Sequence, residues 1–119
     1  MATTALTAEN FESTVEDNEI VLVDFWADWC GPCKRFSPIY EDASVRHEGV
    51  VFAKVDTEDA RDLSTALEIQ SIPTIMAFKQ GQLVFRESGL LNGKQLDALI
   101  GQIQELDIEA ALAEARKQA

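Results

Sequence analysis

Cys30 and Cys33 are the residues of this 119-residue chain whose type and spacing most clearly indicate chemistry. A disulfide between them would close a very small loop, whereas a structural disulfide stabilises a fold most when its loop is long. The pair is therefore better suited to redox chemistry or metal binding than to architecture. A structural zinc site needs about four nitrogen or sulfur ligands, and besides these cysteines the chain offers only His47. We favour redox chemistry over a metal site within one chain.

The position of the cysteines in the chain supports redox chemistry. Residues 20–27 form a short, nearly continuous apolar run that predicts a buried central strand, and a helix is predicted over 31–47. A helix start carries unpaired N–H groups and the positive end of the helix dipole, and both favour a thiolate over a thiol. We expect Cys30 to be exposed and to attack a disulfide. Cys33 is expected to be more buried and to resolve the mixed disulfide.

Asp24 interrupts the apolar run of the predicted central strand. We expect it to be buried, which raises the pKa of a carboxyl group, and a carboxylate near Cys33 could then accept the thiol proton when that cysteine attacks. The alternative is that the strand lies near a sheet edge and Asp24 reaches water. Lys54 is the corresponding polar residue of a neighbouring apolar strand. It either pairs with Asp24 or extends its ammonium group to solvent.

Apolar periodicity predicts the elements that position these residues. Helices are predicted from Thr7 to about Asp17, over 60–68 and from Asn92, and Pro38 should kink the helix at 31–47. Strands are predicted over 50–55, 74–78 and 83–86, the last two joined by a turn at Gln80-Gly81. The strand–helix–strand start implies parallel pairing with a right-handed crossover. The predicted fold is α/β, with a mixed central sheet flanked by helices on both faces.

Residues 107–119 are predicted to form an extra amphipathic helix. Asp107 is a good N-cap, and apolar residues follow it at helical spacing, namely Ile108, Ala111, Leu112 and Ala115. We expect this helix to pack on its own domain, because apolar helix faces usually join a core. The chain is therefore divided into one domain at 1–106 and a helical extension at 107–119 that is not a separate domain.

The composition excludes several classes of function. With 46% hydrophobic and 26% charged residues, the chain has the composition of an ordinary globular protein. Its net charge of −11 argues against nucleic acids and anionic membrane surfaces as partners. The N-terminus lacks the basic region and apolar stretch of a secretory signal, and no apolar run is long enough to span a bilayer. We expect a cytoplasmic monomer.

Three segments of the chain resemble the thioredoxin family. The segment Val23-Asp24-Phe25-Trp26-Ala27-Asp28-Trp29-Cys30-Gly31-Pro32-Cys33-Lys34 is similar to its active site almost residue for residue. Ile72-Pro73-Thr74 resembles its cis-proline loop and Ser88-Gly89 its second substrate loop. Ser88 stands where the family often has an apolar residue, which could loosen or alter substrate contacts. The resemblance runs from about Leu6 to Leu106 and implies the thioredoxin fold.

The resemblance also implies a reaction and its partners. It implies reduction of disulfides in target proteins, with Asp24 helping to move the proton and a cis bond before Pro73 packed against the dithiol. A substrate segment would bind in a shallow apolar groove formed by Trp29, Gly31, Pro32, Ile72 and Gly89. The redox-active Cys30–Cys33 disulfide would be reduced by a thioredoxin reductase. NADPH and flavin would then act only through that reductase, and the protein itself would bind no cofactor.

Two other functions remain open at this point. In the first, the chain is a thioredoxin-fold interaction module in which the dithiol is secondary and residues 107–119 dock a partner. In the second, it is an oxidase or isomerase of an oxidising compartment. The pair Gly31-Pro32, which resembles the reducing members of the family, and the missing secretory signal argue against the second.

Overall fold

A five-stranded mixed sheet forms the centre of the structure, a computed structural model that describes residues 3–118. Its strands are β1 (Thr3–Ala5), β2 (Ile20–Trp26), β3 (Val51–Asp56), β4 (Thr74–Lys79) and β5 (Gln82–Ser88), in the spatial order β1-β3-β2-β4-β5. β3 pairs parallel with both β1 and β2, whereas β4 pairs antiparallel with both β2 and β5. β2 is therefore the central strand, as its continuous apolar sequence predicted.

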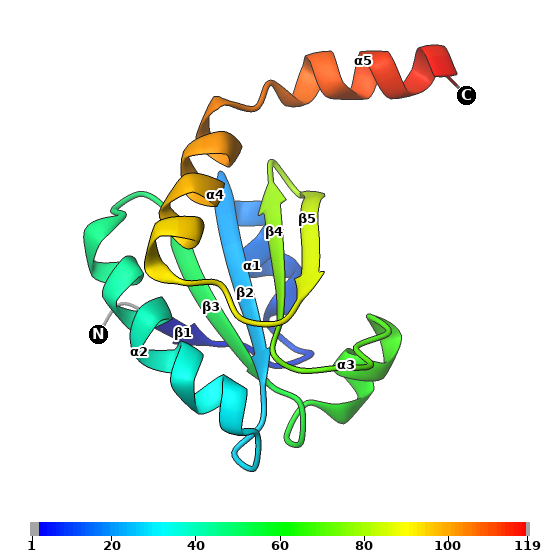
Figure 1. Ribbon diagram of the computed structural model, residues 1–119. Helices are drawn as coiled ribbons and strands as arrows, with labels where there is room; N and C mark the ends of the chain where they lie inside the picture. The colour runs from blue at the N-terminus through cyan, green and yellow to red at the C-terminus, as the bar shows by residue number, and fades with distance from the viewer. Residues whose placement is uncertain (1–2, 119) are drawn as a thin grey trace.

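Helices cover both faces of this sheet. They are α1 (Phe11–Asp17), α2 (Gly31–Arg46), α3 (Arg61–Ala66) and α4 (Gly93–Glu105), and a further helix, α5 (Ile108–Gln118), follows them. α2 and α4 pack on one face of the sheet, and α1 and α3 pack on the other (Figure 1). The predicted α/β architecture, including the extra C-terminal helix, is confirmed.

Alternation along β2 directs its side chains to two separate cores. Leu22 joins the core beneath α2 and α4, while Val21 and Val23 join the core beneath α1 and α3. Asp24 is two residues beyond Leu22 and therefore faces α2. The same alternation holds on β3, where Phe52 belongs to the core beneath α2 and α4 and Lys54 comes two residues later. The sheet thus places Asp24 and Lys54 on the face that α2 covers.

The N-terminal region differs from its prediction in two ways. β1 was not predicted, because three residues are too few to show a period-2 pattern. Thr7 does not cap a helix: its backbone N–H donates to Asn10 Oδ1 at 2.7 Å, and α1 begins only at Phe11. Asn10 and Thr7 thus form a turn that precedes the helix, and the predicted helix start at Thr7 is wrong.

The C-terminal helix α5 forms as predicted, but most of its apolar face does not join the core. Ile108 is buried, whereas Ala111, Leu112 and Ala115 are exposed. Figure 1 shows α5 extending away from the sheet. Its contact with the domain lies near its start, where Ile108 and Leu112 line a small pocket with Leu83. The prediction that the apolar face packs on its own domain therefore holds only for the first turn.

Lys79, the last residue of β4, fixes the end of α4. The residue is buried, and its ammonium group donates to the carbonyl oxygens of Ile103, Gln104 and Leu106 at 2.8, 2.9 and 2.7 Å. A cation at this end of a helix satisfies carbonyl groups that have no partner within the helix. The interaction anchors the segment from which α5 starts.

Replacing Lys79 by methionine is expected to lower the free energy of unfolding by roughly 2–3 kcal/mol, because one buried and two partly buried carbonyl groups lose a charged donor. Urea unfolding followed by circular dichroism measures this loss. Lys94→Met, at an exposed position of α4, is the matched control and should change stability by no more than about 0.5 kcal/mol. Equal losses in the two variants would contradict the anchoring role of Lys79.

Candidate active site

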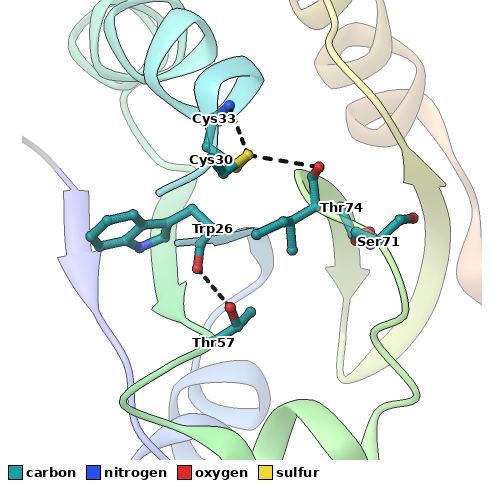
Figure 2. Close-up of a disulfide and its surroundings, with 7 residues drawn as sticks. Trp26, Cys30, Cys33, Thr57, Ser71 and Thr74 are labelled. Atoms are coloured by element: carbon teal, nitrogen blue, oxygen red, sulfur yellow. Dashed lines mark hydrogen bonds between the residues drawn. A yellow bond between two sulfur atoms is a disulfide. The ribbon is translucent and has the colours of Figure 1, made fainter. Parts of the chain in front are cut away.

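The two cysteines lie where β2 ends and α2 begins. Cys30 is the N-cap of α2 and has an extended backbone, and Cys33 lies in the first turn of the helix. The two are joined by a disulfide, with their Cα atoms 5.3 Å apart. The backbone N–H of Cys33 donates to Cys30 Sγ at 3.2 Å, a contact drawn in Figure 2. The helix N-terminus thus directs a hydrogen-bond donor at the sulfur of Cys30, which favours negative charge on that sulfur.

Burial does not distinguish the two cysteines. Cys30 is 4% exposed and Cys33 is 3% exposed, so the prediction of an exposed Cys30 is wrong for this disulfide form. Both pack with Ala27 against Trp26 and Ile72. Ile72 comes from a loop 42 residues further along the chain, and sequence reasoning did not account for how closely this loop covers the sulfur. The surroundings of the two sulfurs, rather than their exposure, set them apart.

The loop before β4 packs against Cys30. The Ile72–Pro73 peptide bond is cis, as the resemblance implied. The carbonyl oxygen of Ile72 lies 3.8 Å from Cys30 Sγ. Figure 2 draws a dashed line from the Cys30 sulfur toward the loop that carries Ser71 and Thr74. The backbone N–H of Gly89 donates to the carbonyl oxygen of Pro73 at 2.8 Å. The cis-proline loop and the loop after β5 are therefore held together next to the disulfide.

An exposed aromatic side chain marks the surface beside the disulfide. Trp29 is 70% exposed, and together with Ile72 it lines a shallow depression of about 270 Å³. The other residues of this depression are Thr57, Ile69, Gln70 and Ser71. Gly31, Pro32 and Gly89 are exposed nearby but do not line it. The structure thus brings Trp29 and Ile72 together in one groove and places the remaining predicted contact residues outside it.

Ser88 connects the two loops that the family resemblance assigns to substrate binding. Its Oγ accepts a hydrogen bond from Ser71 Oγ at 2.8 Å and lies 3.2 Å from Thr74 Oγ1. Sequence reasoning noticed Ser88 as a departure from the family but gave no indication of Ser71. Both serines are exposed, so no burial pattern in the sequence indicated that their hydroxyl groups would meet.

Asp24 lies in a cavity that also contains the second cysteine. The aspartate is 1% exposed, which confirms its predicted burial and excludes an edge position. The cavity has a volume of about 260 Å³, and its lining residues are Asp24, Trp26, Asp28, Cys33, Lys34, Ser37 and Lys54. Within residues 3–118, Asp24 Oδ1 has no hydrogen-bond partner. Burial raises the pKa of Asp24 from 3.8 to about 7, with Lys54 lowering it and Glu41 raising it.

Lys54 pairs with a glutamate of α2 rather than with Asp24. Its Nζ lies 3.8 Å from Glu41 Oε1 and donates to Ser37 Oγ at 3.4 Å. The ammonium group also lies 5.1 Å from the ring centroid of Trp26. The described part of the chain contains no ion pair between Lys54 and Asp24, so the predicted pairing is wrong.

Glu41 was missed by sequence reasoning, although a signal was present. Cys33, Ser37 and Glu41 recur every four residues along α2, which places them on one face of that helix. Since Cys33 faces the active site, the same spacing could have placed Glu41 near the buried strand residues. Sequence reasoning considered only the partner on the neighbouring strand.

Residues 3–118 contain no group of three or more His, Cys, Asp or Glu side chains placed to hold a metal ion. No helix in this part of the chain combines the length and apolar character needed to cross a membrane.

Comparison with known proteins gives a consistent family. The Thioredoxin family model matches residues 2–105. Putative thioredoxin 2 of Streptomyces coelicolor is 48% identical over 121 residues, covering 99% of this chain and 90% of the relative. Thioredoxin C-2 of Corynebacterium nephridii is 41% identical, covering 81% and 91%.

Solved structures agree with the sequence comparison. A mutant thioredoxin from Halobacterium salinarum NRC-1 superposes with a TM-score of 0.81 at 30% identity, covering 88% of this chain and 93% of that one. The oxidised thioredoxin from Plasmodium falciparum gives a TM-score of 0.75 at 37% identity, covering 84% and 96%. With its disulfide at the start of α2, the chain belongs to the thioredoxin family and is a thiol–disulfide oxidoreductase.

Proposed function

We propose that Cys30 attacks the disulfides of target proteins and that Cys33 completes their reduction. The Cys30 thiolate bonds to one target sulfur and releases the other as a thiolate. Cys33, once deprotonated, attacks Cys30 Sγ and releases the second target sulfur, so the target gains two electrons and this protein becomes oxidised. The hydrogen bond from the Cys33 N–H to Cys30 Sγ supports this order, since it stabilises a negative charge on Cys30.

Asp24 accepts the proton of Cys33 during the second step, directly or through a water. The observation that carries this assignment is the cavity that Asp24 shares with Cys33 and not with Cys30. A carboxyl group whose pKa is about 7 can exchange a proton efficiently near neutral pH. The lack of a hydrogen-bond partner for Asp24 Oδ1 among residues 3–118 leaves that oxygen free to receive the proton.

An extended segment of the target binds beside Cys30. Trp29 and Ile72 provide the apolar surface, and the cis-proline loop offers its backbone for strand addition. The exposed residues Gly31, Pro32 and Gly89 form the rim that the target passes to reach the sulfur, and the buried Pro73 supports the cis-proline loop from below. The hydroxyl group of Ser88 keeps this rim in place by holding Ser71.

A thioredoxin reductase returns the disulfide to the dithiol form and supplies electrons from NADPH through its flavin. We place this cycle in the cytoplasm, because a reducing dithiol of this kind is kept reduced there. The protein acts as a monomer, with residues 107–119 as an extension of the same domain. A coupled assay with NADPH, thioredoxin reductase and insulin tests the proposal: NADPH oxidation that depends on both proteins is expected, and no oxidation above the reductase blank would refute it.

Asp24→Asn is expected to slow the resolving step by roughly 10²-fold at pH 7, because general base catalysis typically contributes an effect of this size. The step can be followed by stopped-flow tryptophan fluorescence as the reduced protein is oxidised by a peptide disulfide. The wild-type rate should depend on pH near 7, and the variant should lose that dependence. A variant with the wild-type rate and pH profile would exclude Asp24 as the proton acceptor.

A further inference from the structure

Glu41 is a half-buried carboxylate group to which the reaction above assigns no role. Its Oε1 accepts a hydrogen bond from Thr3 Oγ1 of β1 at 2.8 Å and lies 3.8 Å from Lys54 Nζ. Its Oε2 is buried and has no hydrogen-bond partner within residues 3–118. The region between the sheet and α2 therefore contains two acidic groups, Asp24 and Glu41, and the ammonium group of Lys54.

Lys54 is within reach of both acidic groups. It is the register partner of Asp24 on the adjacent parallel strand, so their side chains leave the sheet on the same face. In the structure, however, its ammonium group contacts Glu41 and Ser37 of α2 and lies over the Trp26 ring. The ammonium group of Lys54 thus pairs with Glu41 on the helix, although Asp24 on the adjacent strand is on the same face of the sheet.

We propose that Glu41 is a positioning residue for proton transfer: it holds the Lys54 ammonium group on the α2 side of the cavity, away from Asp24, so that Asp24 remains a good proton acceptor for Cys33. This inference rests on the proposed role of Asp24. Thr3 contributes by fixing the Glu41 carboxylate through its hydroxyl group. β1 thereby acts on the active site although it lies at the far edge of the sheet.

The charges around Asp24 determine the direction of the effect. Lys54 lowers the pKa of Asp24 and Glu41 raises it. Without the negative charge of Glu41, the repulsion is lost and Lys54 is free to approach Asp24, so both changes lower the pKa of Asp24. In the disulfide form, the other ionisable groups near Asp24 are Lys34 and Tyr40 on α2 and Asp28 on the preceding turn. None of these lies between Lys54 and Glu41, which are in direct contact.

The test is a carboxyl-carbon NMR titration of Asp24 in the oxidised full-length protein. Glu41→Gln retains the size of the side chain and an acceptor for Thr3 but removes the charge. It should lower the pKa of Asp24 by roughly one unit. Asp42→Asn is the matched control, because it removes one negative charge from the next position of α2, where the side chain is exposed. An unchanged or raised Asp24 pKa in Glu41→Gln would overturn the proposal.

A second variant isolates the contribution of Lys54. In a Lys54→Met background, the effect of Glu41→Gln on the Asp24 pKa should fall to less than half, because no ammonium group is left to move. An undiminished effect would show that Glu41 acts on Asp24 without positioning Lys54 and would refute that step. The oxidation rates of both variants are measured by stopped flow as for Asp24→Asn.

The outcomes for Glu41 and Asp24 are distinguishable. If Asp24→Asn keeps the wild-type rate, the proposed proton transfer fails, and with it the catalytic meaning of Glu41, even if the NMR shift is observed. If Asp24→Asn is slow but Glu41→Gln leaves the titration of Asp24 unchanged, the proton transfer stands and only the role of Glu41 is refuted.

Discussion

Cys30→Ser is expected to lose insulin reduction completely, down to the rate of dithiothreitol alone, whereas Cys33→Ser is expected to accumulate mixed disulfides with target proteins. The serine hydroxyl at position 30 cannot replace a thiolate as the attacking group, so the first bond to the target never forms. With serine at position 33 the first bond forms but nothing within the protein breaks it. The two variants therefore differ in kind, although the two cysteines are almost equally buried in the disulfide form.

Two measurements check these variants. Insulin precipitation driven by dithiothreitol measures the loss of activity, and intact-mass spectrometry detects the adduct between Cys33→Ser and a peptide disulfide. Each variant serves as the control of the other, since both lack the Cys30–Cys33 disulfide and carry one serine at the N-terminal end of α2. Retained activity in Cys30→Ser, or a stable adduct in that variant and none in Cys33→Ser, would reverse the assigned roles.

The attack requires that a target reach a sulfur with little exposed area. In the oxidised protein the Ile72 loop lies against Cys30, while Gly31 and Pro32, which follow it, are exposed. The exposed Trp29 lines one shallow depression together with Ile72. In the proposed function, a target segment laid along the cis-proline loop would approach Cys30 from this side, while Cys33 lines the cavity that contains Asp24.

The parts of the fold that carry strong local patterns could be predicted from the sequence. The apolar run of β2 predicted a strand covered on both faces, and the aspartate within it predicted a buried carboxyl group. The turn at Gln80-Gly81 was predicted correctly: both residues have positive φ, as the tight hairpin between β4 and β5 requires. In each case the signal lies within a few neighbouring residues.

The features that could not be predicted depend on contacts between distant segments. The burial of Cys30 depends on the Ile72 loop, and the partner of Lys54 depends on how α2 lies across β3. The sequence indicated only Asp24, on the adjacent strand, as a partner for Lys54. In the structure the partner is Glu41, which comes from the helix packed over the sheet. The exposure of α5 has a related cause, because an apolar periodicity predicts a helix without specifying what covers it.

Asp24→Asn is expected to stabilise the oxidised protein at alkaline pH and to have little effect on stability in acid. Burial raises the pKa of Asp24 in the folded state from 3.8 to about 7. Between these two pH values the folded protein holds a proton that the unfolded chain has released. The stability that comes with the neutral carboxyl group is therefore complete below about pH 4 and is lost as the pH rises through 7. Asparagine is neutral throughout and does not incur this loss.

The expected gain is roughly 4 kcal/mol in the free energy of unfolding at pH 8.5, where the wild-type carboxyl group is charged while buried. Urea unfolding of the wild type and the variant at pH 4 and pH 8.5 measures it, and the difference between the two pH values cancels any change in packing. Asp42→Asn is the control, because the Asp42 side chain is exposed and its charge is not buried. This variant should change stability by about 0.5 kcal/mol or less.

A gain of equal size at both pH values would show that the asparagine improves packing and that no charge is buried at position 24. A gain confined to alkaline pH means that the native protein retains a destabilising charge at this position, which is understandable if that carboxylate takes up the proton of Cys33.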